Sequence, residues 1–125
     1  MKNLGIAIGI GWLLIGFSVA AWAVEVQTAG LKPLGYCQLT SITSATKLTT
    51  CANGIPAGAE FVLIEAETQN ARWRDDGTAP TTTVGMLLIT TASTPTLYQG
   101  DLTAIQFINA TAGTIVDVSF YQFIR

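Results

Sequence analysis

Two patterns of hydrophobic and polar positions divide this chain. From Leu4 to Val24 no residue is charged, and this run of 21 residues predicts one apolar helix. From Tyr36 onward, short segments rich in threonine, valine, isoleucine and aromatic residues are interrupted by glycine, proline and asparagine, which is typical of β-strands. Eight strands are expected, at Tyr36–Ile42, Thr46–Thr50, Glu60–Glu67, Ala71–Asp75, Met86–Thr90, Thr96–Gln99, Ala104–Asn109 and Thr114–Ile124.

The number and spacing of these segments predict the fold class. Seven or eight short strands indicate an all-β, antiparallel β-sandwich of the jelly-roll or Ig-like kind, preceded by one N-terminal apolar α-helix. The expected organisation is an apolar helix over residues 1–24, a linker over residues 25–35 and the sandwich over residues 36–125.

The apolar segment has two interpretations. As a helix it would be about 31 Å long, enough to cross the hydrocarbon core of a membrane. Gly5 and Gly9 have the spacing that lets membrane helices pack closely, and Lys2 would keep the start of the chain in the cytoplasm. Alternatively, the segment is an export signal cleaved after Ala23. Under either interpretation the remaining domain leaves the cytoplasm.

The two cysteines fit such a destination. Cys37 and Cys51 would close a loop of 15 residues, and a disulfide there would contribute on the order of 3 kcal/mol. The alternative is a pair of buried apolar thiols. No metal site is expected, because the chain has no histidine and two cysteines do not complete a tetrahedral set of ligands.

The segment "RWRDDGTAPT" holds four charged residues in five positions. If Glu60–Glu67 and Ala71–Asp75 formed a hairpin turning at Gln69 and Asn70, two cross-strand ion pairs would form, Glu65 with Arg74 and Glu67 with Arg72. Trp73 would then face the core with Ile64 and Ala66.

Asp75, Asp76 and Gly77 are expected to form the turn that follows this strand. A calcium site in this turn would need more spaced oxygen ligands than the segment supplies. An acid–base carboxylate pair would need the two groups to face each other across a cleft, which neighbouring aspartates do not do.

Charge and composition exclude several classes of function. Apart from Lys2, the chain has five basic and eight acidic residues, so residues 24–125 carry a formal charge of −3 and no basic stripe for nucleic acid. Without histidine, and with the cysteines paired, no nucleophile–base system can be assembled. We therefore expect no enzymatic activity, no cofactor and no small-molecule substrate.

The run "IPAGAEFVLIEAETQNARWRDDGTAPTTTVGMLL", followed by "LYQGDLTAIQFINATAGTIVDVSFYQF", resembles a group of small structural proteins of bacteriophages and prophages. The resemblance covers roughly Ile55 to Phe123. It implies a compact β domain on a virion, as a decoration, fibre or minor coat component, which binds itself and other virion proteins. The apolar N-terminal segment and the cysteine pair depart from that group, and a virus that contains or crosses a membrane would reconcile them.

The sequence thus predicts a membrane-associated virion protein. The alternative is an exported bacterial binding or adhesion module, secreted or periplasmic after cleavage at Ala23.

Overall fold

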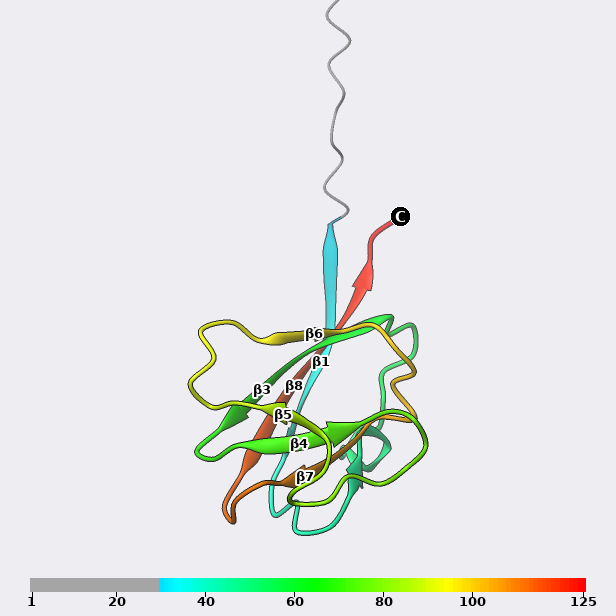
Figure 1. Cartoon of the computed structure of the whole chain (residues 1–125). Helices are drawn as coiled ribbons and strands as arrows, with labels where there is room; N and C mark the ends of the chain where they lie inside the picture. Colours follow the sequence, from blue (N-terminus) through cyan, green and yellow to red (C-terminus); the bar gives the residue numbers. More distant parts are fainter. Residues whose placement is uncertain (1–29) are drawn as a thin grey trace, which may run out of the picture.

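The computed structural model describes residues 30–125, which form eight strands and one short turn of 3₁₀ helix (Figure 1). The elements are β1 (Leu31–Leu39), β2 (Thr46–Lys47), η1 (Leu48–Thr50), β3 (Phe61–Glu67), β4 (Ala71–Arg74), β5 (Met86–Leu88), β6 (Thr96–Tyr98), β7 (Gln106–Asn109) and β8 (Ile115–Phe123). The expected all-β class is confirmed. The expected apolar helix, with Gly5 and Gly9, lies outside the described residues. In residues 30–125 no helix has the length and apolarity needed to cross a membrane.

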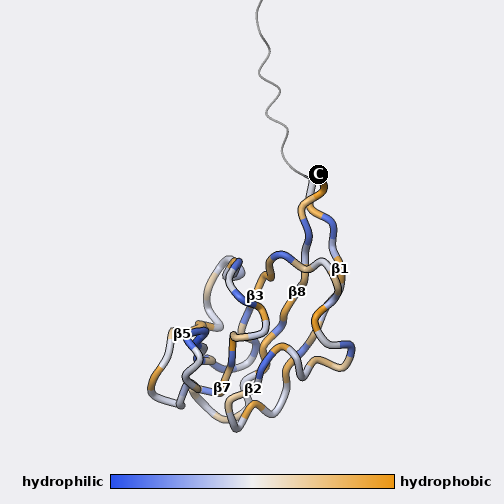
Figure 2. The backbone as a smooth tube through the Cα atoms, turned by 90° about the vertical axis from the view of Figure 1, so that its right-hand side faces the viewer, coloured by the Kyte–Doolittle hydropathy of each residue, from blue (hydrophilic) through white to orange (hydrophobic). Residues whose placement is uncertain are grey.

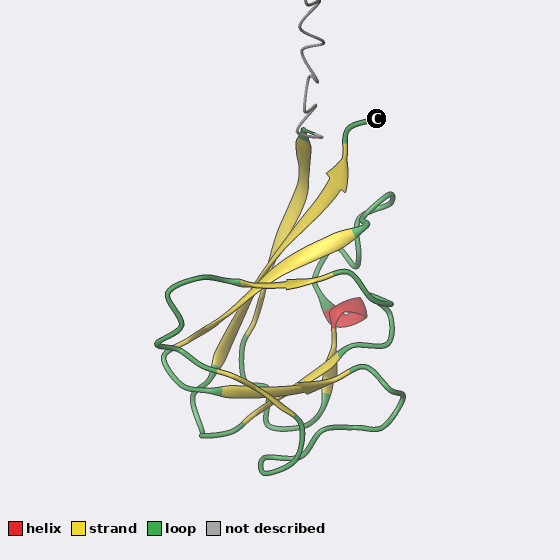
Figure 3. Ribbon diagram, turned by 45° about the horizontal axis from the view of Figure 1, so that its top comes forward, coloured by secondary structure: helices red, strands yellow, loops and turns green. Residues whose placement is uncertain are grey.

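The strands form two antiparallel sheets of four strands each (Figure 3). Sheet A has the order β1-β8-β3-β6, and sheet B has the order β2-β7-β4-β5. The pairing is nested, because β1 pairs with β8, β2 with β7, β3 with β6 and β4 with β5. Two further pairs, β3 with β8 and β4 with β7, complete the sheets.

Alternation of apolar and polar residues along the strands directs side chains into one core between the sheets. In β8, Val116, Val118 and Phe120 are buried while the residues between them are half-buried, and the colours of Figure 2 alternate accordingly. From sheet B, Ala71 and Phe107 reach the same core and are fully buried. Burial of such side chains contributes roughly 1.5–3 kcal/mol each, so the core dominates the stability of the domain.

Strand β1 begins at Leu31, within the segment expected to be a linker, so that boundary was wrong. The residues from Leu31 to Pro33 pair with the end of β8, opposite Phe123, Gln122 and Tyr121. Proline is tolerated here because β1 is an edge strand, and the register shifts between Pro33 and Gly35. The strand ends at Leu39 rather than Ile42, close to Ser41, whose φ of 55° does not fit an extended strand.

The expected hairpin between the third and fourth strands is also wrong, since β3 lies in sheet A and β4 in sheet B. Glu65 is opposite Asp117 and Glu67 is opposite Ile115, both on β8. Consequently the predicted ion pairs of Glu65 with Arg74 and of Glu67 with Arg72 do not form. A cross-strand ion pair contributes only about 0.2–1 kcal/mol, which is too little to outweigh burial of β3 and β4 on opposite sides of the core.

The turn between β3 and β4 has a different role from the one expected. Thr68, rather than Asn70, has the positive φ, at 68°. Asn70 links distant loops instead: its side-chain oxygen accepts a hydrogen bond from the backbone N–H of Thr90 at 3.0 Å. The backbone oxygen of Asn70 accepts from Ala110 N at 3.0 Å and from the hydroxyl of Thr114 at 2.8 Å. This residue therefore fixes the crossing of the chain from one sheet to the other.

Candidate functional site

The two arginines of β4 fasten the long loop that precedes β5. Arg72 donates a hydrogen bond from Nε to the carbonyl of Thr82 at 3.1 Å and one from Nη1 to the carbonyl of Gly85 at 3.0 Å. Because β4 is a central strand of sheet B, these bonds hold the far end of the loop against the sheet. The function of Arg72 in this arrangement is structural.

Arg74 forms an ion pair with Asp76, two residues away on the same turn. The guanidinium of Arg74, followed by the backbone N–H of Thr78, lowers the pKa of the Asp76 carboxyl. Gly77 lies between Asp76 and Thr78 with a φ of 82°, and the backbone N–H of Thr78 donates a hydrogen bond to Asp76 Oδ1 at 3.1 Å, so the chain bends where a turn was expected. Arg74 and Asp76 therefore neutralise each other locally.

Trp73, between these arginines, is half-buried and packs against the core. Its ring meets Tyr98 of β6 edge to face, with ring centroids 5.6 Å apart. Burial of Tyr98, reinforced by the carboxylate of Asp75, raises the pKa of its phenol to about 12. The pair connects the two sheets at the side where β5 and β6 form their edges.

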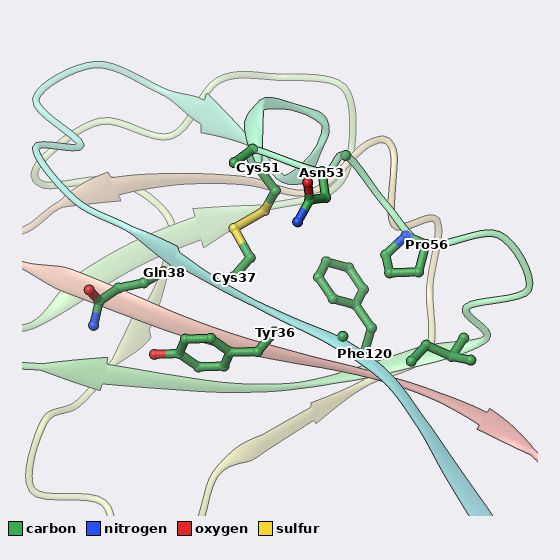
Figure 4. A pocket seen from close by; sticks show the side chains of 11 residues that line it. Tyr36, Cys37, Gln38, Cys51, Asn53, Pro56 and Phe120 are labelled. Carbon is green, nitrogen blue, oxygen red and sulfur yellow. A yellow bond between two sulfur atoms is a disulfide. The ribbon is translucent and has the colours of Figure 1, made fainter.

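Cys37 and Cys51 form the expected disulfide, with their Cα atoms 5.9 Å apart. The bond joins β1 of sheet A to the segment after η1 and forms one wall of a pocket of about 240 Å³ (Figure 4). The ring of Phe120 lies between the disulfide and Pro56, and Asn53 lies at the rim. No residue that lines this pocket in the described part of the chain is charged. Its volume is below the roughly 300–1,000 Å³ of typical small-molecule sites.

The outer face of sheet A carries a second, shallower hollow. It has a volume of about 310 Å³ and is lined by Tyr36, Leu63, Glu65, Pro95, Asp117, Val118, Ser119 and Tyr121. The hydroxyl of Tyr36 donates a hydrogen bond to Asp117, which also accepts one from Gln38 Nε2 at 3.0 Å. Tyr36 is opposite Ser119 in the register, not Asp117, so its ring lies along the sheet surface and is 62% exposed. The hydrogen bond to Asp117 raises the pKa of the Tyr36 phenol.

Glu65, Glu67 and Asp117 give this face its negative charge. Within residues 30–125 the ion pairs are those of Arg74 with Asp76 and of Arg125 with Glu60, so neither Glu65 nor Glu67 has a basic partner there. Over the same residues, no three potential ligands lie in an arrangement that could hold a metal ion. The hydrogen bonds from Tyr36 and Gln38 to Asp117 offset part of the repulsion between Asp117 and Glu65.

The grouping of Tyr36 and Gln38 with Asp117 on this outer face was not anticipated from the sequence. The available signal was the alternation of Tyr36, Cys37 and Gln38, which places the tyrosine and the glutamine on the side opposite the disulfide. Their meeting with Asp117, 79 to 81 positions away, depends on the pairing of β1 with β8.

Comparison with known proteins gives no match for this chain among family descriptions, curated proteins or solved structures.

Proposed function

We propose that this protein is a non-enzymatic structural protein of a virus particle, a decoration, fibre or minor coat component, and that its β domain is a jelly roll. The nested strand order carries the proposal. In a jelly roll, one long ribbon of four strand pairs rolls up, so that each sheet takes alternate pairs. The pairs β1–β8 and β3–β6 lie in sheet A, while β2–β7 and β4–β5 lie in sheet B.

This order distinguishes a jelly roll from the Ig-like alternative. An Ig-like domain places strands A, B, E and D in one sheet and C, F and G in the other. Here the first strand pairs with the last, and the second with the seventh. Jelly rolls occur in viral capsid domains, lectins and cupins. A fold alone does not define a function, so the other features of the chain must favour one of these.

The termini of the domain fit display on a particle. Strands β1 and β8 run together past the rest of the sandwich, and the C-terminus lies at the end of this extension (Figure 1). Gly30 enters the described fold at the same end, where its carbonyl accepts a hydrogen bond from Ile124 N at 2.8 Å. If residues 4–24 form the anchor, the paired strands would act as a short stalk that holds the sandwich away from the membrane.

The disulfide supports a location outside the cytoplasm, because such bonds persist in oxidising compartments and on virion surfaces. An anchored domain on a membrane-associated virion combines this bond with the apolar segment. Its partners would be other copies of the chain and other virion proteins, and the membrane through the N-terminal segment.

The hollow on the outer face of sheet A favours a second candidate function, an exported bacterial binding or adhesion module. An exposed tyrosine ring beside carboxylate and amide groups is a surface that can hold a polar ligand by stacking and hydrogen bonding. Under this alternative the chain would be cleaved after Ala23 and would have no particle to join.

Mass spectrometry of the native protein, combined with sedimentation of particles, tests the proposal. A virion protein with a retained anchor should co-sediment with particles. Its intact mass should be that of a chain that begins at Met1. Antibodies against the domain should decorate the same particles in electron micrographs. A mature chain that starts at Val24, free in the periplasm or the medium and absent from particles, would overturn the proposal in favour of the exported module.

A further inference from the structure

The longest described stretch without charge includes the two open sheet edges. From Gly77 to Gly100 the sequence has no aspartate, glutamate, lysine or arginine over 24 residues. This stretch contains β5 and β6, which are edge strands of sheets B and A. Of the eight large hydrophobic side chains exposed in residues 30–125, five belong to it: Val84, Met86, Leu87, Ile89 and Leu97.

The opposite edges of the same sheets are protected in the usual ways. Strand β1, the other edge of sheet A, carries Lys32, Pro33 and an irregularity between Pro33 and Gly35. Strand β2, the other edge of sheet B, carries Lys47. Lysine, proline and bulges are features by which proteins block pairing at open sheet edges. Strand β5 has none of these features, so sheet B has one blocked edge, at β2, and one open edge, at β5.

The surroundings hold β5 in position. On its inner side β5 pairs with β4, and its register places Leu87 opposite Arg72. Arg72 holds the carbonyl of Gly85 immediately before the strand, and Val84 exchanges backbone hydrogen bonds with Thr81. A strand that is already ordered loses little conformational freedom when a partner binds. The outer side of β5 has backbone groups directed away from β4, as every edge strand does.

We propose that β5 pairs antiparallel with β5 of a second copy of this chain across a two-fold axis, so that the two copies of sheet B form one continuous sheet. Val84, Met86, Leu87 and Ile89 would be covered in this contact. A two-fold contact brings the same surface of both copies together. Because residues 77–100 carry no charge, two copies of β5 would bring no like charges of their own face to face. The residues before Gly30 join the fold at β1, at the far edge of sheet A, which favours a second copy over that segment as the occupant.

The β5–β5 contact would be the self-association that the proposed function includes. An exported module would form the same contact, so the contact does not depend on the virion proposal. Its test measures the mass of the oligomer, whereas the proposed function is tested by particles and by the mature N-terminus. Failure of one is therefore distinguishable from failure of the other.

The test compares oligomer mass by light scattering for the full chain in mild detergent. Leu87→Lys places a charge in the contact, and Ile124→Lys places the same charge at a similarly exposed position away from it, the two side chains being 45% and 57% exposed. We expect the unaltered chain and Ile124→Lys to be dimers. Leu87→Lys should dissociate, with a Kd at least about tenfold higher, because facing like charges repel. An equimolar mixture of Leu87→Lys and Leu87→Glu should restore the dimer, since opposite charges would then meet.

Far-UV circular dichroism should show that each variant is folded, and Met86→Lys, at a side chain 62% exposed, serves as a second variant in the same strand. A monomeric unaltered chain would overturn the inference. So would an oligomer that survives both Leu87→Lys and Met86→Lys, because copies would then meet elsewhere, for example through residues 1–24. Loss of the dimer in Ile124→Lys to the same extent as in Leu87→Lys would also contradict it.

Discussion

Arg72 and Arg74 lie two positions apart on one strand, and their different partners predict different effects on stability. Arg72→Ala removes two hydrogen bonds to loop carbonyls, of which the one to Gly85 is part-buried, and should cost about 1–2 kcal/mol of unfolding free energy. Arg74→Ala removes an exposed ion pair within one turn and should lower the unfolding free energy less than Arg72→Ala does, because solvent screens exposed pairs. Denaturant unfolding measures both, with hydrogen exchange at residues 82–85 as a local readout. Equal losses, or unchanged exchange in Arg72→Ala, would contradict the role given to Arg72.

Tyr98 should ionise only at strongly alkaline pH. Its pKa of about 12 in the folded state lies above the value of about 10 expected in the unfolded chain. The folded state therefore binds its proton more tightly, so stability is fully present below about pH 10 and falls as the pH rises toward 12. Absorbance of tyrosinate during an alkaline titration should show this late step. Tyr98→Phe should remove it, and its persistence in that variant would assign it to another residue.

At the scale of the elements, the sequence located the strands but not their partners. All eight segments expected to be strands overlap an observed strand, because alternation along a single strand is local information. Whether Glu60–Glu67 pairs with the next segment or with one 50 residues later depends on how the whole core closes. The charges in "RWRDDGTAPT" suggested that β3 pairs with β4. Instead β3 pairs with β8, because Ile64 and Ala71 are buried in the core from opposite sheets. The outer-face group of Tyr36, Gln38 and Asp117 was unpredictable for the same reason, while the disulfide and the turn at Gly77 were predictable from short-range patterns.

The disulfide should contribute to holding the two sheets together. It joins β1 in sheet A to the segment that follows β2 of sheet B, and both cysteines are buried. Replacing both by serine should cost about 3 kcal/mol of unfolding free energy, as expected for a closed loop of this length. Alkylating reagents should label neither cysteine in the native protein and both after unfolding with a reductant. Ready labelling without reduction would exclude the bond.

For the whole molecule, the apolar segment and the disulfide make a joint prediction about topology. If residues 4–24 carry the domain across a bacterial inner membrane while Lys2 stays inside, Cys37 and Cys51 are exposed to an oxidising compartment. In spheroplasts that express the full chain, externally added protease should digest the domain, and the two cysteines should be resistant to alkylation.

A variant with charges placed in the middle of the apolar segment provides the control. Replacing apolar residues of the segment with charged ones, such as Leu13→Arg together with Ile15→Arg, should block membrane insertion, since each arginine at a helix centre costs roughly 2.5–3.5 kcal/mol on insertion scales. The domain should then remain in the reducing cytoplasm, protected from external protease, with both thiols free to react. If the disulfide formed equally in both proteins, it would carry no information about compartment, and the placement of this domain outside the cytoplasm would lose its structural support.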